Sequence, residues 1–466
     1  MLLSIVWLNC RIVAIKKESV RGTFYDNSED EVTKFIVDNL SGKMPFLNDV
    51  VALMVPHAGH FYSGKVAISA FLQVKNSNIN RVFIFADNHE SKFLDRKLAV
   101  PSFDVFEIFG KQIPVDTTFI KAICEKLPQC SVISDMPFYS HIIEVQLPFL
   151  QHFIPKNYSL VPMIFNGIDD KEVKSIADFI CSQLKSGDLI IVSSDMTHYL
   201  PQAEAVTNDN QTLTAILRDA DIDKENSICG PESMQCLRVI ARKFKWMPYF
   251  IDYSTSMSAS GDDTNVVGYG AIAWTCDKVR INSDAQKELL ALAHDTILAK
   301  LEGSPLPSVD PLLIKFPQLC VKQSVFVTLM CEGKLRGCIG SLDSFENNIA
   351  DGVQKMAIQA AFYDPRFEPL TQREFEKIDI KISILGFSQY LNKPVDEWAP
   401  FLKNMSEKPG VILDIDGRTS TFLPEVWDDL PDPEDFLCSL SMKQGRRADD
   451  WKSSNAHLYL YSTQHF

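Results

Sequence analysis

The sequence predicts an α/β front domain with a mostly parallel, covered sheet, followed by an α+β domain with an antiparallel sheet. Up to residue 275, short β-branched apolar runs alternate with amphipathic helical stretches, which is the pattern of βαβ units. After residue 288 the pattern changes to a helix followed by hairpins. The stretch 276–288 between them is polar and typical of a linker. We therefore predict domains at residues 1–278 and 285–466.

In the front domain, the runs predicted as strands are continuously apolar, which is typical of strands buried on both faces of a sheet. The predicted strands are 49–56, 81–87, 160–165, 189–195 and 266–274, and the predicted helices are 29–40, 119–127, 171–184 and 205–220.

In the second domain, two hairpins are expected, with Glu332-Gly333 and Asp416-Gly417 at their turns. The other predicted elements are helices at 286–301, 348–363 and 433–445, and strands at 379–386 and 456–463.

Composition excludes several classes of protein. The chain has 466 residues and 46 Lys and Arg against 60 Asp and Glu, so its formal net charge is −14, which disfavours general nucleic-acid binding. No run approaches the roughly 18 apolar residues that a membrane span needs. The eleven cysteines form no CxxC pair, and we expect buried thiols in a reducing, cytoplasmic compartment. Residues 1–17 are expected to be an extended start or an added strand.

Histidines follow the predicted strands of the front domain at similar positions. His57 follows 49–56, His89 follows 81–87, and Asp195 and His198 follow 189–195. Ligands of open α/β sheets bind at the carboxyl ends of the strands, so these side chains can converge on a metal such as Fe(II), Zn or Cu. The alternative is that each histidine is a surface or hydrogen-bonded residue.

The segment 140–153 adds a further pair. His141 and Glu144 are three residues apart and share a face if the segment is helical. They can bind metal or act as an acid–base pair, or they can simply form a solvent-facing pair at a helix start. His60 is a candidate for supporting the site, and His152 is expected to be structural.

These residues belong to motifs that resemble the Memo-like family. The motifs are VRGTFYDNSEDEV, VPHAGHFYSG, FADNHE, HIIEVQLPFL and SSDMTHY, in order over residues 18–275. The resemblance implies a class III extradiol dioxygenase-like fold and a metal site at His57, His89 and the Asp195–His198 segment. In animal members a cysteine after DYxxS joins the site. Ala259 and its serine neighbours stand there in this chain, so the expected ligands are nitrogen and oxygen atoms, favouring Fe(II) or Zn over Cu(I).

The second domain resembles the AMMECR1 family. The motifs are KLRGCIGSL, AAFYDPRFEPLTQREF, DIKISIL, GRTSTFLPEVW and SLSMKQG, over residues 285–463. Arg336 and Cys338 are two apart on a predicted strand and share a face, and Asp364 and Arg366 form a polar group that can face them. These four residues define a candidate pocket. Cys338 is either a nucleophile activated by a nearby cation or a small buried residue, and the second is favoured.

In prokaryotes these two families commonly occur with a radical-SAM protein, and this chain resembles the first two components fused. A radical-SAM protein is therefore the expected partner. Three functions stay open. The first is a metal-dependent, dioxygenase-like oxidoreductase in which His141, Glu144 or Asp195 assists catalysis. The second is a non-catalytic accessory protein that binds a metal or peptide. The third is a metal-free relic whose histidines only hydrogen-bond.

Overall fold

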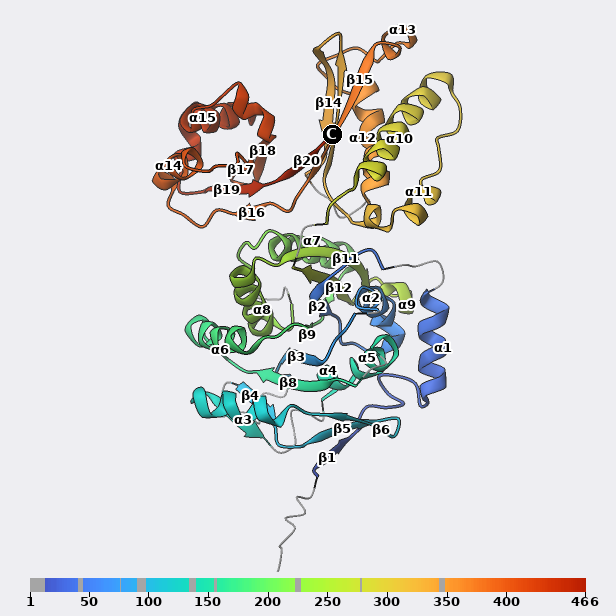
Figure 1. Ribbon diagram of the computed structural model, residues 1–466, viewed down its shortest axis with the longest axis vertical. Coiled ribbons are helices and arrows are strands. Elements are labelled where there is room, and N and C mark those ends of the chain that lie inside the picture. Colours follow the sequence, from blue (N-terminus) through green and yellow to red (C-terminus); the bar gives the residue numbers. More distant parts are fainter. Residues whose placement is uncertain are drawn as a thin grey trace, which may run out of the picture.

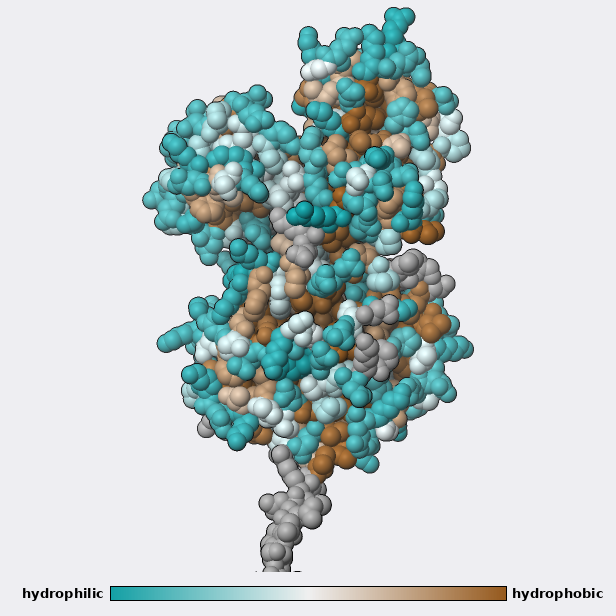
Figure 2. All heavy atoms as spheres, in the orientation of Figure 1, coloured by the Kyte–Doolittle hydropathy of each residue, from teal (hydrophilic) through white to brown (hydrophobic). Residues whose placement is uncertain are grey.

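The computed structural model describes residues 13–40, 45–75, 77–89, 98–133, 140–154, 157–222, 228–276, 279–342 and 348–466. The chain forms a front half and a second half that is itself divided into two lobes (Figure 1). A narrow waist joins the halves, and apolar residues gather there on the face shown in Figure 2.

The front half is built on a nine-stranded sheet. Its order is β10-β12-β2-β9-β3-β8-β4-β7, and β11 pairs with the part of β12 that β10 leaves free. The strands are β2 (Val50–Val55), β3 (Arg81–Asp87), β4 (Leu98–Pro101), β7 (Cys130–Ile133), β8 (Ser159–Phe165), β9 (Asp188–Ser193), β10 (His198–Leu200), β11 (Met247–Thr255) and β12 (Val266–Thr275).

The sheet is mixed, which corrects the prediction of a mostly parallel sheet. The four central strands β2, β9, β3 and β8 are parallel, and so are the edge strands β4 and β7. The strand β12 runs antiparallel to β2, β10 and β11, and β4 runs antiparallel to β8. The connection from β11 to β12 is too short for a parallel crossover, so these two strands form an antiparallel pair.

Helices cover the sheet on both sides, with α1, α2 and α5 to its right and α6 and α8 to its left in Figure 1. This double cover explains why all seven residues of β3 are buried. The helices are α1 (Glu29–Leu40), α2 (His60–Leu72), α3 (Thr117–Lys126), α4 (His141–Glu144), α5 (Leu147–Phe153), α6 (Asp170–Gln183), α7 (Gln202–Leu217), α8 (Pro231–Phe244) and α9 (Met257–Ser260).

A three-stranded sheet lies at the far end of the front half. It consists of β1 (Ile15–Lys17), β5 (Val105–Ile108) and β6 (Lys111–Pro114), and β1 pairs in parallel with β5. The expectation of an added strand near the start of the chain therefore holds for β1. Residues 1–12 lie outside the described residues.

The second half contains two four-stranded antiparallel sheets, so the predicted antiparallel pairing is confirmed, but the strands divide into two sheets where one was expected. One has the order β14-β13-β15-β20 and the other β16-β19-β17-β18. The strands are β13 (Val325–Cys331), β14 (Lys334–Gly340), β15 (Ile378–Leu385), β16 (Gln389–Tyr390), β17 (Gly410–Ile415), β18 (Arg418–Phe422), β19 (Ala456–Tyr461) and β20 (Thr463–His465). The helices are α10 (Ser283–Glu302), α11 (Asp310–Lys315), α12 (Ile349–Phe362), α13 (Gln372–Phe375), α14 (Trp398–Lys403) and α15 (Pro433–Lys443).

Both predicted hairpin turns are present. Glu332 and Gly333 have φ of 50° and 77°, and Asp416 and Gly417 have φ of 52° and 77°. Two successive left-handed residues match the twist of the flanking strands, which is why Gly stands at the second position of each turn.

The two halves share one continuous apolar core, which includes side chains of β2 and β12 in front and of α10, α12 and β13 behind. A backbone hydrogen bond also joins them, from the Tyr390 N–H to the Arg218 carbonyl over 3.1 Å. The linker is held to the second half by the Ile281 N–H, which donates to the side-chain Oε1 of Gln464 over 2.8 Å. Within the described ranges, no helix has the length and apolar character to cross a bilayer.

Candidate metal centre

The carboxylate of Asp195 joins the ends of two neighbouring parallel strands. His57 follows β2 and Asp195 follows β9. The backbone N–H groups of His57 and Ala58 both donate to Oδ1 of Asp195, over 2.7 and 3.2 Å. Burial raises the pKa of Asp195 to about 7, and these two N–H donors oppose that rise. Asp195 therefore positions the loop that carries His57.

Ser193, which contacts the His57 ring, determines which nitrogen of that ring carries the proton. Ser193 donates its single hydroxyl proton to the Ile142 carbonyl over 2.5 Å, and its oxygen accepts from Nε2 of Gln146 over 2.9 Å. The remaining contact, 3.3 Å to Nδ1 of His57, must then use a ring N–H. Nε2 of His57 is left with its lone pair available.

His89 has the same tautomer for a similar reason. Its Nδ1 lies 3.1 Å from the Asp87 carbonyl, which can only accept a proton, so Nε2 of His89 also carries a lone pair. The two Nε2 atoms of His57 and His89 are 3.2 Å apart. With metal–nitrogen bonds of about 2.1 Å, this separation lies between the roughly 3.0 Å of a right angle and the roughly 3.4 Å of a tetrahedral angle. Two unprotonated nitrogens that face each other so closely are suited to a shared cation.

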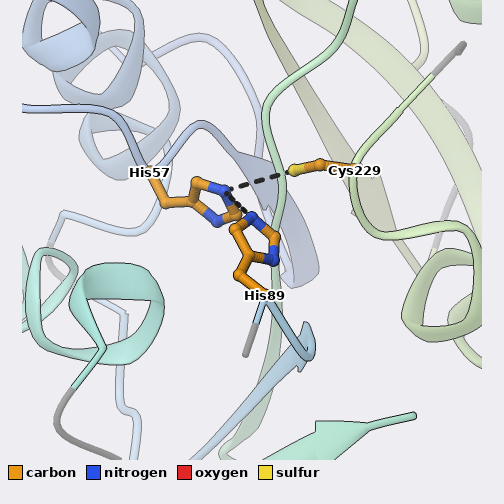
Figure 3. A group of neighbouring side chains, drawn as sticks. All are labelled: His57, His89 and Cys229. Atoms are coloured by element: carbon orange, nitrogen blue, oxygen red, sulfur yellow. Dashed lines mark hydrogen bonds between the residues drawn. The ribbon is translucent and has the colours of Figure 1, made fainter. Parts of the chain in front are cut away.

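Cys229 completes the cluster. Its Sγ lies 3.2 Å from Nε2 of His57, and the backbone N–H of Asp195 donates to it over 3.0 Å. The candidate ligand atoms of His57, His89 and Cys229 all lie within 4.8 Å of one another, and they come from three separate segments (Figure 3). Burial raises the pKa of the Cys229 thiol, so the thiol keeps its proton unless a cation binds beside it.

Cys229 corrects the expected set of nitrogen and oxygen ligands. The family resemblance places the cysteine after DYSTS, where α9 contains Ala259. Cys229 instead comes just before α8, which begins at Pro231, and so it does not follow a strand. Strand-end positions therefore do not predict it, although a cysteine directly before a Gly-Pro helix start is a local signal.

His198 is exposed and does not belong to the group formed by His57, His89 and Cys229. Its Nδ1 is 2.8 Å from the Met196 carbonyl, so its Nε2 is also unprotonated. It lies near enough to His57 for its charge to help lower the pKa of His57, after burial, His89 and His141. His198 is not in the group of ligand atoms within 4.8 Å of one another.

His141 forms a wall of the cluster. Its ring stacks on Phe24 at 4.2 Å and lies perpendicular to the His57 and His89 rings, at 5.4 and 6.0 Å between centroids. Burial, and then the charge of His89, lowers the pKa of His141 to about 4. His141 is therefore a neutral imidazole facing the candidate ligands at neutral pH.

Glu144, the proposed partner of His141, is engaged elsewhere. It is fully buried, and its carboxylate accepts hydrogen bonds from Ser19, Val20 and the Tyr25 hydroxyl over 2.7 to 2.9 Å. Lys16 lies 3.8 Å away. No hydrogen bond joins Glu144 to His141 in the described part of the chain. The structure thus gives Glu144 an anchoring role toward the segment 16–25.

His60 is also engaged within the fold. It is buried, its Nε2 contacts the Val145 carbonyl at 2.9 Å, and burial lowers its pKa to about 4. His60 therefore supports the packing of α2.

Three of the four pocket residues predicted in the second half, Cys338, Asp364 and Arg366, interact with one another, and Arg336 lies apart from them. Asp364 accepts from the Cys338 N–H over 2.9 Å and pairs with Arg366 over 2.7 Å, while Arg366 also donates to the Cys338 carbonyl over 3.0 Å. Arg366, more than any other neighbour, lowers the pKa of Asp364 to about 2. Arg336 instead pairs with Glu374 over 2.9 Å.

The glycine of the same motif is required by close packing. A Cβ atom on Gly337 would lie 2.2 Å from the Ala360 carbonyl of α12. The LRGCIG motif therefore combines a close approach of strand and helix with an ion pair held against the Cys338 backbone.

Fold and site together define a chain with a candidate transition-metal centre in front and an antiparallel domain behind. Residues 16–273 match the family model of the Memo-like proteins, and residues 290–466 match that of AMMECR1. The chain therefore belongs to the Memo-like family and carries an AMMECR1 domain behind the Memo-like one.

Two MEMO1 family proteins support the assignment to the Memo-like family. A MEMO1 family protein of Desulfurococcus amylolyticus is 30% identical over 289 residues, covering 55% of this chain and 99% of that protein. One from Sulfurisphaera tokodaii is 28% identical over 278 residues, covering 55% and 97%. The solved structure of the uncharacterized protein PH0010 from Pyrococcus horikoshii is 27% identical, covering 40% of this chain and 92% of that one, with a TM-score of 0.36.

The anchoring role of Glu144 gives a first prediction. In Glu144→Gln, one of the two accepting oxygens becomes an NH₂ group, which cannot accept a hydrogen bond from the N–H groups of Ser19 and Val20. The free energy of unfolding should therefore fall by about 2–4 kcal/mol. Urea denaturation measures this loss, and limited proteolysis should cut the segment 16–25 faster. Glu125→Gln, at an exposed ion pair, should change stability by less than about 0.5 kcal/mol. Unchanged stability of Glu144→Gln would contradict the anchoring role.

Proposed function

We propose that this protein binds a transition-metal ion through His57, His89 and Cys229, and that this centre carries the function of the Memo-like domain. The observation behind the proposal is the pair of unprotonated Nε2 atoms 3.2 Å apart with a thiol beside them. The Nδ1–H group of each imidazole donates a hydrogen bond, to Ser193 from His57 and to the Asp87 carbonyl from His89. Both rings are thereby held in the tautomer that leaves Nε2 free to bind a metal.

The thiol changes which metals fit. Imidazole suits iron, zinc and copper, whereas thiolate strengthens the binding of zinc and Cu(I). The preference for Fe(II) or Zn over Cu(I) assumed nitrogen and oxygen ligands only, and Cys229 removes that basis. Fe(II), Zn(II) and Cu(I) are therefore the three candidate ions.

We propose an oxidoreductase, dioxygenase-like function for the centre when it holds a redox metal. Such an ion would supply one-electron chemistry and an acidic site for a substrate oxygen. One side of the centre is accessible to a substrate, because His89 and His198 are both exposed to solvent. His141, held flat against Phe24, is the imidazole placed to take a proton from a substrate beside His57 and His89.

A second candidate function is an accessory protein for a radical-SAM partner. It is favoured by the shared core, which holds the AMMECR1 domain firmly against the Memo-like domain so that both present surfaces to one partner. Affinity purification from the native host should recover a radical-SAM protein with the full chain. Recovery of the chain without such a protein, under conditions that preserve iron–sulfur proteins, would contradict this candidate.

Metal analysis tests the centre itself. Protein purified without a histidine tag should hold about one metal ion per chain, because three converging ligands suffice for tight binding. His57→Ala and Cys229→Ser should each lose most of that metal. Elemental analysis distinguishes iron, zinc and copper.

Two matched variants serve as controls for this measurement. His152→Ala and the exposed Cys276→Ser change the same residue types outside the centre and should keep the metal. Equal metal content in all five proteins would overturn the proposal. Full metal content in Cys229→Ser alone would remove the cysteine from the ligand set.

The serine beneath His57 gives an independent prediction. Ser193→Ala removes the acceptor that holds the proton on Nδ1, so metal affinity should fall by about 10–100-fold, as for other partners of ligand histidines. Competition with a chelator measures the affinity. The exposed Ser182→Ala should bind as the wild type does. An unchanged affinity in Ser193→Ala would show that Ser193 does not orient His57.

A further inference from the structure

A large cavity lies between the two halves, away from the metal centre. Its volume is about 1030 Å³, which is ample for a small-molecule ligand. The front half contributes the ends of α7 and α8 and parts of β11 and β12, while Phe387, Gln389 and Tyr390 come from the second half. In Figure 1, β16 lies above α7 and α8 at this position. Because both domains form its walls, the cavity depends on the fusion.

The charge of the cavity is opposite to that of the chain. Four cations line it, and Asp219 is the one carboxylate among the lining residues that the structure describes. The whole chain, by contrast, has a formal net charge of −14. The four cations are Arg238, Arg242, Lys245 and Arg280. A concave site with this excess attracts anions.

Asp219 is already shared by two of these cations. It has a left-handed φ of 53° after the end of α7, and its Oδ1 accepts from Nε of Arg238 over 3.0 Å and from Nη2 of Arg242 over 2.9 Å. Arg238 is only 4% exposed, and the charges of both Asp219 and Asp221 stabilise its guanidinium group. The charges of Arg238 and Arg242 are therefore partly balanced, and the excess positive charge of the cavity comes mainly from its other two cations.

The other two cations, Lys245 and Arg280, give the cavity most of its excess positive charge. Within the described ranges of the chain, neither Lys245 nor Arg280 forms an ion pair or a side-chain hydrogen bond. Both are exposed, so both can reorient toward a bound anion. The polar side of the cavity therefore offers donors that no described carboxylate occupies.

Aromatic rings form another part of the wall. Trp246 and Tyr390 both line the cavity and are half-buried. The Trp246 ring stacks on Phe244 at 5.4 Å between centroids, and the Tyr390 ring packs against Tyr459 at 5.6 Å. The rings are thus held in place before a ligand arrives, which lowers the entropic cost of stacking a flat group on them.

We propose that this interdomain cavity binds a small phosphate ester that carries a planar ring, such as a nucleotide. Arg280, Lys245 and Arg242 receive the phosphate oxygens, and Trp246 and Tyr390 receive the ring. Guanidinium groups suit phosphate because their donors match two oxygens at once. A ligand held between the domains would also strengthen their contact. The proposal does not depend on the metal centre.

Calorimetric titration of the full chain at low ionic strength tests the anion site, with inorganic pyrophosphate as the probe. Pyrophosphate should bind saturably, and Arg280→Gln/Lys245→Asn should weaken binding about tenfold, equivalent to about 1.4 kcal/mol. Asn is chosen because Lys245 has a left-handed φ of 58°. Added salt should weaken the binding further.

The matched control removes the same two charges elsewhere. Arg447→Gln/Lys121→Gln alters side chains that are 91% and 78% exposed, and it should bind pyrophosphate as the wild type does. No saturable binding to the wild type, or equal weakening in both double variants, would overturn the anion site. Metal content should be unchanged in every one of these variants. A failure of the anion site can therefore be distinguished from a failure of the proposed metal centre.

The ring-binding part is tested with adenosine diphosphate. It should bind the wild type more tightly than pyrophosphate does, and Tyr390→Ala should remove that advantage while leaving pyrophosphate binding unchanged. Equal affinity of the wild type for the two probes would overturn the assignment of a planar ring.

Discussion

The hydrogen bonds from the His57 and Ala58 N–H groups to Asp195 set the geometry of the candidate metal centre. They join the loop after β2 to the loop after β9, two strands that pair in parallel. The same Asp195 presents its own N–H to Cys229. One buried residue thus positions two of the three candidate ligands, and its fixed backbone leaves their donor atoms little freedom to separate.

A second layer of hydrogen bonds decides the protonation of the imidazoles. Ser193 can donate only one proton, and the Ile142 carbonyl takes it. That single choice forces the proton of His57 onto Nδ1, and the Asp87 carbonyl has the same effect on His89. The free lone pairs of both Nε2 atoms are therefore set by groups outside the three candidate ligands. The buried Glu144 contributes at a greater distance by holding the segment that contains Phe24, on which His141 rests.

The fusion creates features that neither domain has alone. The shared core buries the waist, and the Tyr390 N–H joins β16 to the end of α7. Cations from α8 then face aromatic side chains of the second half across a common cavity. The proposed anion site thus draws on residues of both domains, which only the fusion brings together.

Most of the elements and the antiparallel pairing of the second domain could be predicted from the sequence, because apolar periodicity and turn residues such as Asp416-Gly417 act over short distances. It also placed His57 and His89 at the correct strand ends, since parallel strands bring their carboxyl ends to one edge. The folded structure was needed to show that β12 runs antiparallel to β2, that Cys229 joins the two histidines, and that Glu144 faces the segment 16–25. Those outcomes depend on contacts between segments more than a hundred residues apart, such as Cys229 with His57, which local patterns do not encode.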